Sequence, residues 1–265
     1  MYSATQLAFK YLKYYFTAAN GKGHGVHSPF VFDFIINVIN DKRNFYAYQS
    51  IENLRQNLLR DDKILSIEDF GAGSTVAKSN QRKVSDIARS ALKPKKFSQL
   101  MFRMVDYYKV NTIVELGTSL GVTTSYLASG NLKGKVYTFE GAKQVARVAA
   151  QNFEELSLTN ITLIEGNFDE TLQSTLANIN KLDFAFVDGN HRKEPTINYF
   201  NQLLERANQN SIFIFDDIHW SAGMEEAWEH IKNHPSVTLT IDLFFIGLVF
   251  FRKEQKVAQH FSIRF

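Results

Sequence analysis

Acidic residues follow two apolar segments of this chain at positions where they could act together. Asp188 comes directly after the run 183–187, and Asp216 and Asp217 follow the run 211–215. Clustered carboxylates repel one another, which raises their pKa values unless a cation neutralises them. Hard divalent ions such as Mg²⁺, Ca²⁺ or Mn²⁺ prefer shells of oxygen ligands. The three aspartates are therefore predicted metal ligands.

A histidine, His191, stands three positions after Asp188 and can accept a proton. Histidine has an ordinary pKa of about 6.5, which suits a general base at neutral pH. Beside a divalent ion that polarises a hydroxyl group, His191 would take the proton of that hydroxyl. The alternative is a metal-free cluster, in which Asp188 orients His191 and Asp217 caps the following helix.

A second pair of acids lies on either side of a turn that contains two glycines. Glu115 precedes Gly117 and Gly121, and Glu140 ends another apolar segment 23 residues after Gly117. Glycines let the backbone turn tightly and approach a ligand, and an acid on the next strand can accept both ribose hydroxyls. The third glycine of the dinucleotide fingerprint is absent, and Glu115 would repel a phosphate but attract an ammonium group. The pattern favours a zwitterionic nucleoside over NAD.

The turn and the distant acid resemble motifs I and II of the class I S-adenosylmethionine (SAM) methyltransferases. The turn spans residues 115–121, and the acid is Glu140. The segments 25–32 and 216–221 also look like those of a group of bacterial SAM-dependent methyltransferases of unassigned substrate. This resemblance implies SAM as the cofactor and methyl transfer as the reaction.

The acid cluster resembles that of the catechol-type, metal-dependent O-methyltransferases. Asp188, Asp216 and Asp217 match the positions of that group's metal ligands, and residues 188–191 are similar to the Asp-Gly-x-His signature of a sister branch. The residues after His191 meet that signature only in part. The resemblance implies a catalytic role for Asp188 and His191.

The resemblance also implies which residues hold SAM. Residues at the end of the first strand would bind its methionine portion, an acid after the second its ribose, and residues after the third its adenine. The implied cofactor-binding residues are Glu115, Gly117, Thr118, Ser119, Gly121, Thr123, Glu140, Gly166, Asn167, Phe168 and Asp188.

These residues need a sheet that gathers its strand ends at one edge. From residue 112 onward, apolar segments alternate with helical patterns, which indicates a parallel, doubly wound α/β sheet. The segments 237–243 and 245–252 predict a C-terminal hairpin, so one late strand runs antiparallel. The resemblance adds a Rossmann-like, seven-stranded sheet. In such a sheet, ligands bind beyond the carboxyl ends of the strands.

The chain is expected to have two parts. Residues 1–82 are predicted to form a helical appendage over the acceptor side of the pocket, and residues 83–265 the methyltransferase core. A glycine-rich loop at 20–27 contains two histidines and is either a lid or a plain surface loop. Glu68–Ser74 imitates the glycine turn, but no strand ending in an acid follows it, so a loop is predicted there.

Composition excludes several classes of protein. The chain has 265 residues, 45% of them hydrophobic, and no cysteine, which excludes disulfides and thiolate chemistry. No apolar run approaches the roughly 18–20 residues of a membrane span, and the start is not a signal peptide, so a cytoplasmic protein is expected. Residues 1–110 carry a net charge of +8 and residues 111–265 a net charge of −5. This asymmetry fits either mutual docking of two layers or an anionic partner.

The sequence thus predicts a SAM-dependent methyltransferase that methylates an oxygen of a small hydroxylated acceptor. The cofactors expected are SAM and a divalent ion, Mg²⁺ or else Mn²⁺ or Ca²⁺. No membrane or nucleic-acid partner is expected, and a homodimer is left open. Three alternatives remain: a Rossmann enzyme that uses NAD or a nucleotide sugar, a non-catalytic SAM- or metabolite-binding module, and a methyltransferase acting on RNA.

Overall fold

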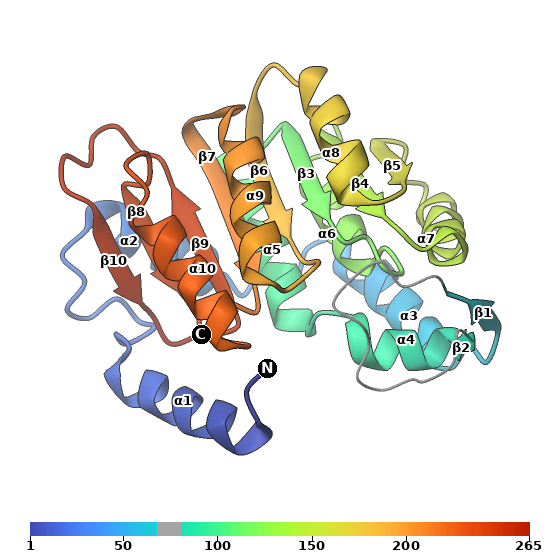
Figure 1. Ribbon diagram of the computed structural model, residues 1–265, viewed down its shortest axis with the longest axis horizontal. Helices are drawn as coiled ribbons and strands as arrows, with labels where there is room; N and C mark the ends of the chain where they lie inside the picture. The colour runs from blue at the N-terminus through green and yellow to red at the C-terminus, as the bar shows by residue number, and fades with distance from the viewer. Residues whose placement is uncertain (68–80) are drawn as a thin grey trace. The chain divides into compact units, whose positions relative to one another are not determined.

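The computed structural model describes residues 1–67 and 81–265, which form two compact units (Figure 1). Lys42–Asn178 is the central unit, and Met1–Asp41 together with Ile179–Phe265 is the composite unit. The loop predicted at Glu68–Ser74 lies outside the described residues. Because the units divide the chain at places other than residue 82, a separate appendage of residues 1–82 stays a prediction.

The central unit is built on three parallel strands, β3 (Thr112–Leu116), β4 (Lys135–Glu140) and β5 (Ile161–Glu165). Each strand leads into a helix, α6 (Val122–Gly130), α7 (Lys143–Glu155) and α8 (Phe168–Ala177) respectively. Strand β3 is apolar and buried along most of its length, as a parallel strand between helical layers should be. Leu116 pairs with Phe139, and Glu140 with Glu165, so the three strands end side by side.

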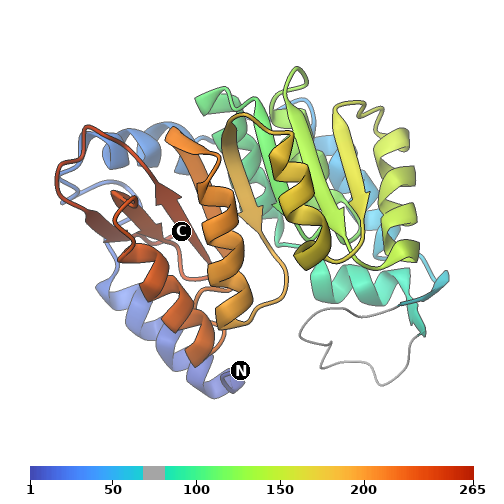
Figure 2. The ribbon, with the colours of Figure 1, turned by 45° about the horizontal axis from the view of Figure 1, so that its top comes forward.

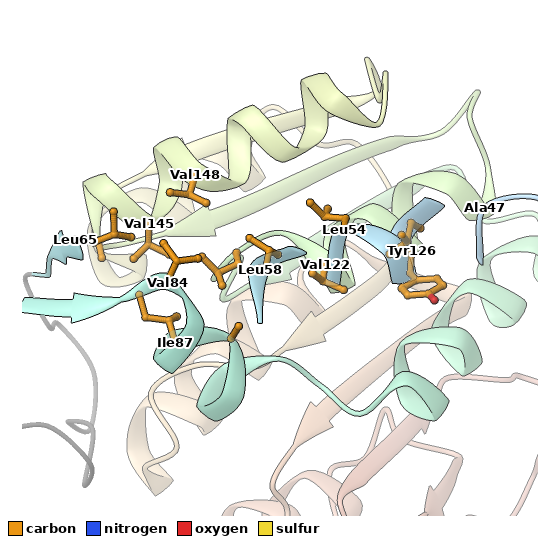
Figure 3. Packing of buried hydrophobic residues seen from close by; sticks show 14 of the residues in the cluster. Ala47, Leu54, Leu58, Leu65, Val84, Ile87, Val122, Tyr126, Val145 and Val148 are labelled. Carbon is orange, nitrogen blue, oxygen red and sulfur yellow. The ribbon is translucent and has the colours of Figure 1, made fainter. Parts of the chain in front are cut away.

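The helices that precede β3 share a core with the helices that follow it. These are α3 (Tyr48–Leu58), α4 (Val84–Ala91) and α5 (Lys95–Tyr108), and a small hairpin of β1 (Ile64–Ser66) and β2 (Gln81–Lys83) lies between α3 and α4. Figure 3 shows Leu58 of α3 and Ile87 of α4 in one cluster with Val122 of α6 and Val145 of α7. Full burial of one such side chain stabilises the fold by about 1.5–3 kcal/mol.

The composite unit contains five strands in the order β10-β8-β9-β7-β6. They are β6 (Leu182–Val187), β7 (Ala207–Asp216), β8 (Leu239–Asp242), β9 (Ile246–Phe250) and β10 (Gln259–Ser262). Strands β6 and β7 are parallel, whereas β9 runs antiparallel to both β7 and β8. The predicted C-terminal hairpin and its antiparallel strand are confirmed.

Helices cover both faces of strand β9. Helix α10 (Ala222–Lys232) lies beside α9 (Lys193–Leu204) in both views (Figures 1 and 2). The Trp228 ring of α10 packs so closely on Gly247 that a Cβ there would come within 2.6 Å of it. On helix α2 (Pro29–Phe34), the Phe34 ring contacts that of Phe250, with centroids 6.2 Å apart. Residues 247 and 250 point to opposite faces of the strand, so α10 and α2 cover opposite faces.

The predicted Rossmann-like α/β fold is confirmed, but the predicted count of seven strands is wrong. The central unit contains three of the strands of the large sheet and the composite unit contains five, which makes eight. The additional strand is β10, which pairs parallel to β8. Its four residues, Gln259–Ser262, lack an apolar run and show only short alternation. Among the described residues, no helix is both long and apolar enough to cross a membrane.

Candidate functional site

The candidate residues fall into two groups, one in each unit. The glycine-turn site of the central unit comprises residues 115–121, Glu140 and residues 166–168. The acid–histidine cluster of the composite unit comprises Asp188, His191 and Asp216.

The glycine turn is fixed by its backbone. Gly117, Ser119 and Gly121 all have positive φ angles, of 107°, 48° and 80°. The amides of Gly117 and Thr118 both donate to the carbonyl oxygen of Phe139, at 3.1 and 3.0 Å. A Cβ at Gly121 would lie 2.5 Å from the Phe153 ring, so both conformation and space require glycine there.

Glu115 is fully buried beneath this turn. Its Oε2 accepts hydrogen bonds from Thr124, at 2.5 Å, and from Thr138, at 2.6 Å. The other oxygen, Oε1, is buried and has no hydrogen-bond partner among the described residues. Burial raises the pKa of Glu115 to about 7, and the two threonine hydrogen bonds limit that rise. A buried acid, one of whose oxygens lacks a hydrogen-bond partner among the described residues, thus lies directly before the turn.

Glu140 ends strand β4 and faces the turn. Its Oε2 accepts from the backbone amide of Ser119 at 2.8 Å, and its Oε1 from that of Ala142 at 2.9 Å. The carboxylate is only partly buried. Its position at the strand end, beside the glycine turn, agrees with the sequence prediction, while its ribose-binding role stays a prediction.

The segment after β5 comes to the same edge. The amide of Gly166 donates to the carbonyl oxygen of Glu140 at 3.0 Å, which joins the ends of β4 and β5. Asn167 caps helix α8 through its side chain. The rings of Phe168 and Phe139 make an edge contact with centroids 6.5 Å apart. Residues from three strand ends therefore meet here, as the fold requires.

The hydroxyl groups of two threonines predicted for the cofactor site lie close to other hydroxyl groups of the protein. Thr118 is buried, and its Oγ1 lies 2.6 Å from that of Thr138. Thr123 is nearly buried on helix α6, and its Oγ1 lies 3.5 Å from that of Ser98. Their predicted role toward the SAM carboxylate is not tested by these contacts.

The acid–histidine cluster forms where β6 and β7 end. Val187 pairs with Phe215, which places the next residues, Asp188 and Asp216, side by side. One ligand atom each from Asp188, His191 and Asp216 lies within 4.8 Å of the others, and the His191 Nε2 is 3.8 Å from the Asp188 Oδ1. Asp216 is only 1% exposed, whereas Asp188 and His191 are partly accessible.

Asp217 does not join this group of described residues. Its φ angle is 53°, and its amide donates to the Phe245 carbonyl oxygen at 2.7 Å, so the chain turns there. Two carboxylates and an imidazole can hold a divalent ion, but this donor set suits Mn²⁺ or Zn²⁺ better than the all-oxygen shell predicted from sequence. The residues present therefore fit a metal of a softer kind than Mg²⁺ or Ca²⁺.

His219 has a role that the sequence did not reveal. Its Nδ1 lies 3.0 Å from the Glu225 Oε1 and its Nε2 lies 2.8 Å from the Asp242 Oδ2. Burial alone lowers the pKa of His219, but hydrogen bonds and charge from Asp242 and Glu225 raise it above its ordinary value. Glu225 also accepts from Lys10 and Tyr2 at 2.8 Å each, which anchors the first helix, α1 (Ala4–Thr17). Because Tyr2 and Lys10 lie more than 200 residues from Glu225, no local pattern could have linked the first helix to this network.

Comparison with known proteins shows what this part of the chain is similar to. The family model for a methyltransferase domain matches residues 114–218, which span strand β3 to the end of β7. Residues 114–218 are therefore similar to a methyltransferase domain, and the chain shares the fold of SAM-dependent methyltransferases of known structure.

Two curated relatives match parts of the chain. The chain is 37% identical over 75 residues to a protein of Sulfolobus acidocaldarius named a probable cobalt-precorrin-6B C(15)-methyltransferase, covering 28% of this chain and 37% of that protein. It is 31% identical over 116 residues to the protein-L-isoaspartate O-methyltransferase of Thermosipho melanesiensis, covering 43% and 54%. The chain thus spans between about a third and a half of these relatives.

Solved structures share the fold over more of the chain. The Podospora anserina methyltransferase PaMTH1, solved with S-adenosylhomocysteine (SAH), superposes with a TM-score of 0.59 at 14% identity and covers 85% of this chain and 97% of its own. The Streptomyces achromogenes O-methyltransferase TomG, solved with SAM, gives 0.53 at 18% identity and covers 61% and 82%.

Proposed function

We propose that this protein is a SAM-dependent methyltransferase that methylates an oxygen atom of a small hydroxylated acceptor. The observation that carries the proposal is the glycine-turn site, where a fixed backbone turn lies between the buried Glu115 and the partly exposed Glu140. This site lies in a domain that matches a methyltransferase family. Oxygen as the acceptor atom is supported by the O-methyltransferases among the proteins that the chain resembles.

The site fits SAM chemically. The unsatisfied Oε1 of Glu115 would accept a hydrogen bond from the ammonium group of SAM, which would also lower the cost of ionising this acid. Glu140, whose carboxylate accepts from two backbone amides, would also accept hydrogen bonds from the ribose hydroxyls. Gly166, Asn167 and Phe168 would contact the adenine.

The reaction needs an acceptor oxygen that can attack in line. When bound, SAM supplies an electrophilic methyl group on a sulfonium. His191 would take the proton of the acceptor hydroxyl as the new carbon–oxygen bond forms and the carbon–sulfur bond breaks. Asp188, whose Oδ1 is 3.8 Å from the His191 ring, would stabilise the imidazolium that results. The site must also exclude water, because water competes as a methyl acceptor.

A divalent metal is a second candidate for activating the hydroxyl. Asp188, His191 and Asp216 would hold it, and His191 would then be a ligand rather than the base. Titration of chelator-treated protein with Mn²⁺, followed by electron paramagnetic resonance, separates the two ideas. Metal-dependent chemistry requires tight binding that Asp188→Asn abolishes and Glu229→Gln, an exposed control, retains. Absence of binding leaves His191 as the base.

The acceptor class is tested by transfer from methyl-labelled SAM. Panels of catechols and other phenols, sugars and short RNAs would each be incubated with the protein, and labelled product measured. Labelled small-molecule product with a methyl ether bond supports the proposal. Label on RNA alone supports an RNA methyltransferase, and SAH binding without label on any panel supports a non-catalytic binding module. Either of these results contradicts O-methylation of a small acceptor.

A further inference from the structure

The composite unit has a pocket that the proposed function does not use. It lies between helix α1, the loop that follows it, the end of the π-helix η1 (Ile35–Ile39) and the residues after β10, and it has a volume of about 460 Å³. Its wall, here called the tyrosine pocket, includes Tyr11, Tyr15, Lys22, Asn40, Arg264 and Phe265.

The walls of the tyrosine pocket are fixed by contacts between distant segments. The amide of Ala19 donates to Ser262 at 2.8 Å, and the amide of Arg264 donates back to the Ala19 carbonyl oxygen at 3.1 Å. The Asn40 side chain donates to the Gly21 carbonyl oxygen at 2.8 Å. A Cβ at Gly21 would lie 2.4 Å from the Arg264 carbonyl oxygen, so no other residue fits there. Contacts to Asn40 and Arg264 thus make the start of the loop 20–27 part of the pocket wall.

The π-helix beside this pocket supports a binding role. The helix η1 follows α2 without a break, and its closing hydrogen bond runs from the Asn40 amide to the Ile35 carbonyl oxygen at 3.0 Å. A π-helical turn is less stable than an α-helical one and is found frequently at functional sites. Here it turns Ile39 and Asn40 into the pocket wall.

Two cationic side chains, those of Lys22 and Arg264, line the tyrosine pocket. Within the described part of the chain, neither Lys22 nor Arg264 has a side-chain carboxylate as an ion-pair partner, and the Arg264 guanidinium lies over the Tyr15 ring, 5.3 Å from its centroid. Residues 1–32 contain no aspartate or glutamate. The nearby Asp242 is already bound by His219. No aspartate or glutamate is among the residues that line this pocket, which also include Phe265, the last residue of the given sequence.

We propose that the tyrosine pocket binds a small organic anion that carries an aromatic ring, such as an aryl carboxylate or an aryl phosphate. The planar guanidinium of Arg264 matches a planar or tetrahedral oxyanion, and Lys22 adds a second charge. Tyr11 and Tyr15 offer ring faces and edges against which an aromatic ring packs. The volume lies within the range of small-molecule sites. This proposal does not depend on methyl transfer.

A binding experiment with four probes tests it. The whole protein, labelled with ¹⁵N, would be titrated with benzoate, phenyl phosphate, benzamide and inorganic phosphate. Benzoate and phenyl phosphate should shift the amides of Asn20, Lys22, Asn40 and Arg264 in a saturable way. Benzamide lacks the charge and inorganic phosphate lacks the ring, so each should bind at least about tenfold more weakly.

Variants locate the binding. Arg264→Gln and Lys22→Gln should each weaken benzoate binding by about tenfold, because each loses one charge-assisted contact. Lys13→Gln, at an exposed lysine of α1, should leave the affinity unchanged. Lys22 is exposed, so its variant stays informative even if Arg264→Gln fails to fold. The proposal is overturned by benzamide binding as well as benzoate, by unchanged affinity in Lys22→Gln, or by the absence of saturable shifts with either anion.

Discussion

The glycine-turn site and the acid–histidine cluster are built by different means. In the first, backbone amides and carbonyls fix the geometry, and the side chains that matter are held by hydrogen bonds of 2.5–2.9 Å. In the second, three side chains approach within 4.8 Å, but the histidine and the nearest carboxylate oxygen stay 3.8 Å apart. Backbone hydrogen bonds therefore set the geometry of the first site. The second is a looser group of side chains.

The comparison predicts that a substitution in one site leaves the function of the other site unchanged. His191→Ala should lower kcat by about 10²–10⁴-fold, since it removes a general base, and leave SAH affinity unchanged. Methyl transfer to an accepted substrate, with SAH calorimetry beside it, measures both. His230→Ala removes an exposed histidine of α10 and should change neither. Full activity in His191→Ala would end the base assignment.

The backbone of the glycine turn should be the less tolerant of substitution. Gly121→Ala adds a Cβ that overlaps the Phe153 ring at a left-handed φ, which should cost about 2–4 kcal/mol of stability. Chemical unfolding measures this cost. Gly25→Ala is the matched control, because Gly25 has a similar φ but nothing within 4 Å of its Cβ, and only the conformational cost of about 1 kcal/mol should remain. Equal losses of stability in the two variants would show that the overlap with the Phe153 ring contributes nothing to the cost.

Glu115 should give the glycine-turn site a pH dependence of its own. Between pH 4.5 and about 7, the folded chain keeps a proton on Glu115 that the unfolded chain has lost. Stability from this group therefore falls as pH rises through that window, by about 3 kcal/mol in total, since one pKa unit corresponds to about 1.36 kcal/mol. Glu115→Gln should remove this decline. Unfolding curves at several pH values would contradict the account if the variant and the parent fell in parallel.

The sequence predicted the strand-end residues well because one rule places them. Parallel strands end at a common edge, so residues such as Glu140, Gly166 and Asp188 can be placed once the strands are recognised. The structure has each of these at a strand end, and it joins Glu140 to the glycine turn through Ser119.

Other features depend on information that a local pattern does not contain. Which residue of the pair Asp216–Asp217 joins His191 depends on the left-handed turn at Asp217, and the sequence alone does not define that turn. The His219 network joins residues from the two ends of the chain. Strand β10 is short and polar, so its own residues do not favour a strand. Its pairing with β8 stabilises the extended conformation.

The central claim is that the glycine-turn site binds SAM and that Glu140 holds its ribose. Calorimetric titration of SAH into the parent protein and Glu140→Ala tests it most directly, with Glu154→Ala as a control at an exposed acid of the same unit. We predict saturable binding by the parent and the control, and affinity lower by about 10–100-fold in Glu140→Ala, because hydrogen bonds to a charged group contribute about 1.5–3 kcal/mol. Equal affinity in all three proteins, or no binding to the parent, would contradict the account.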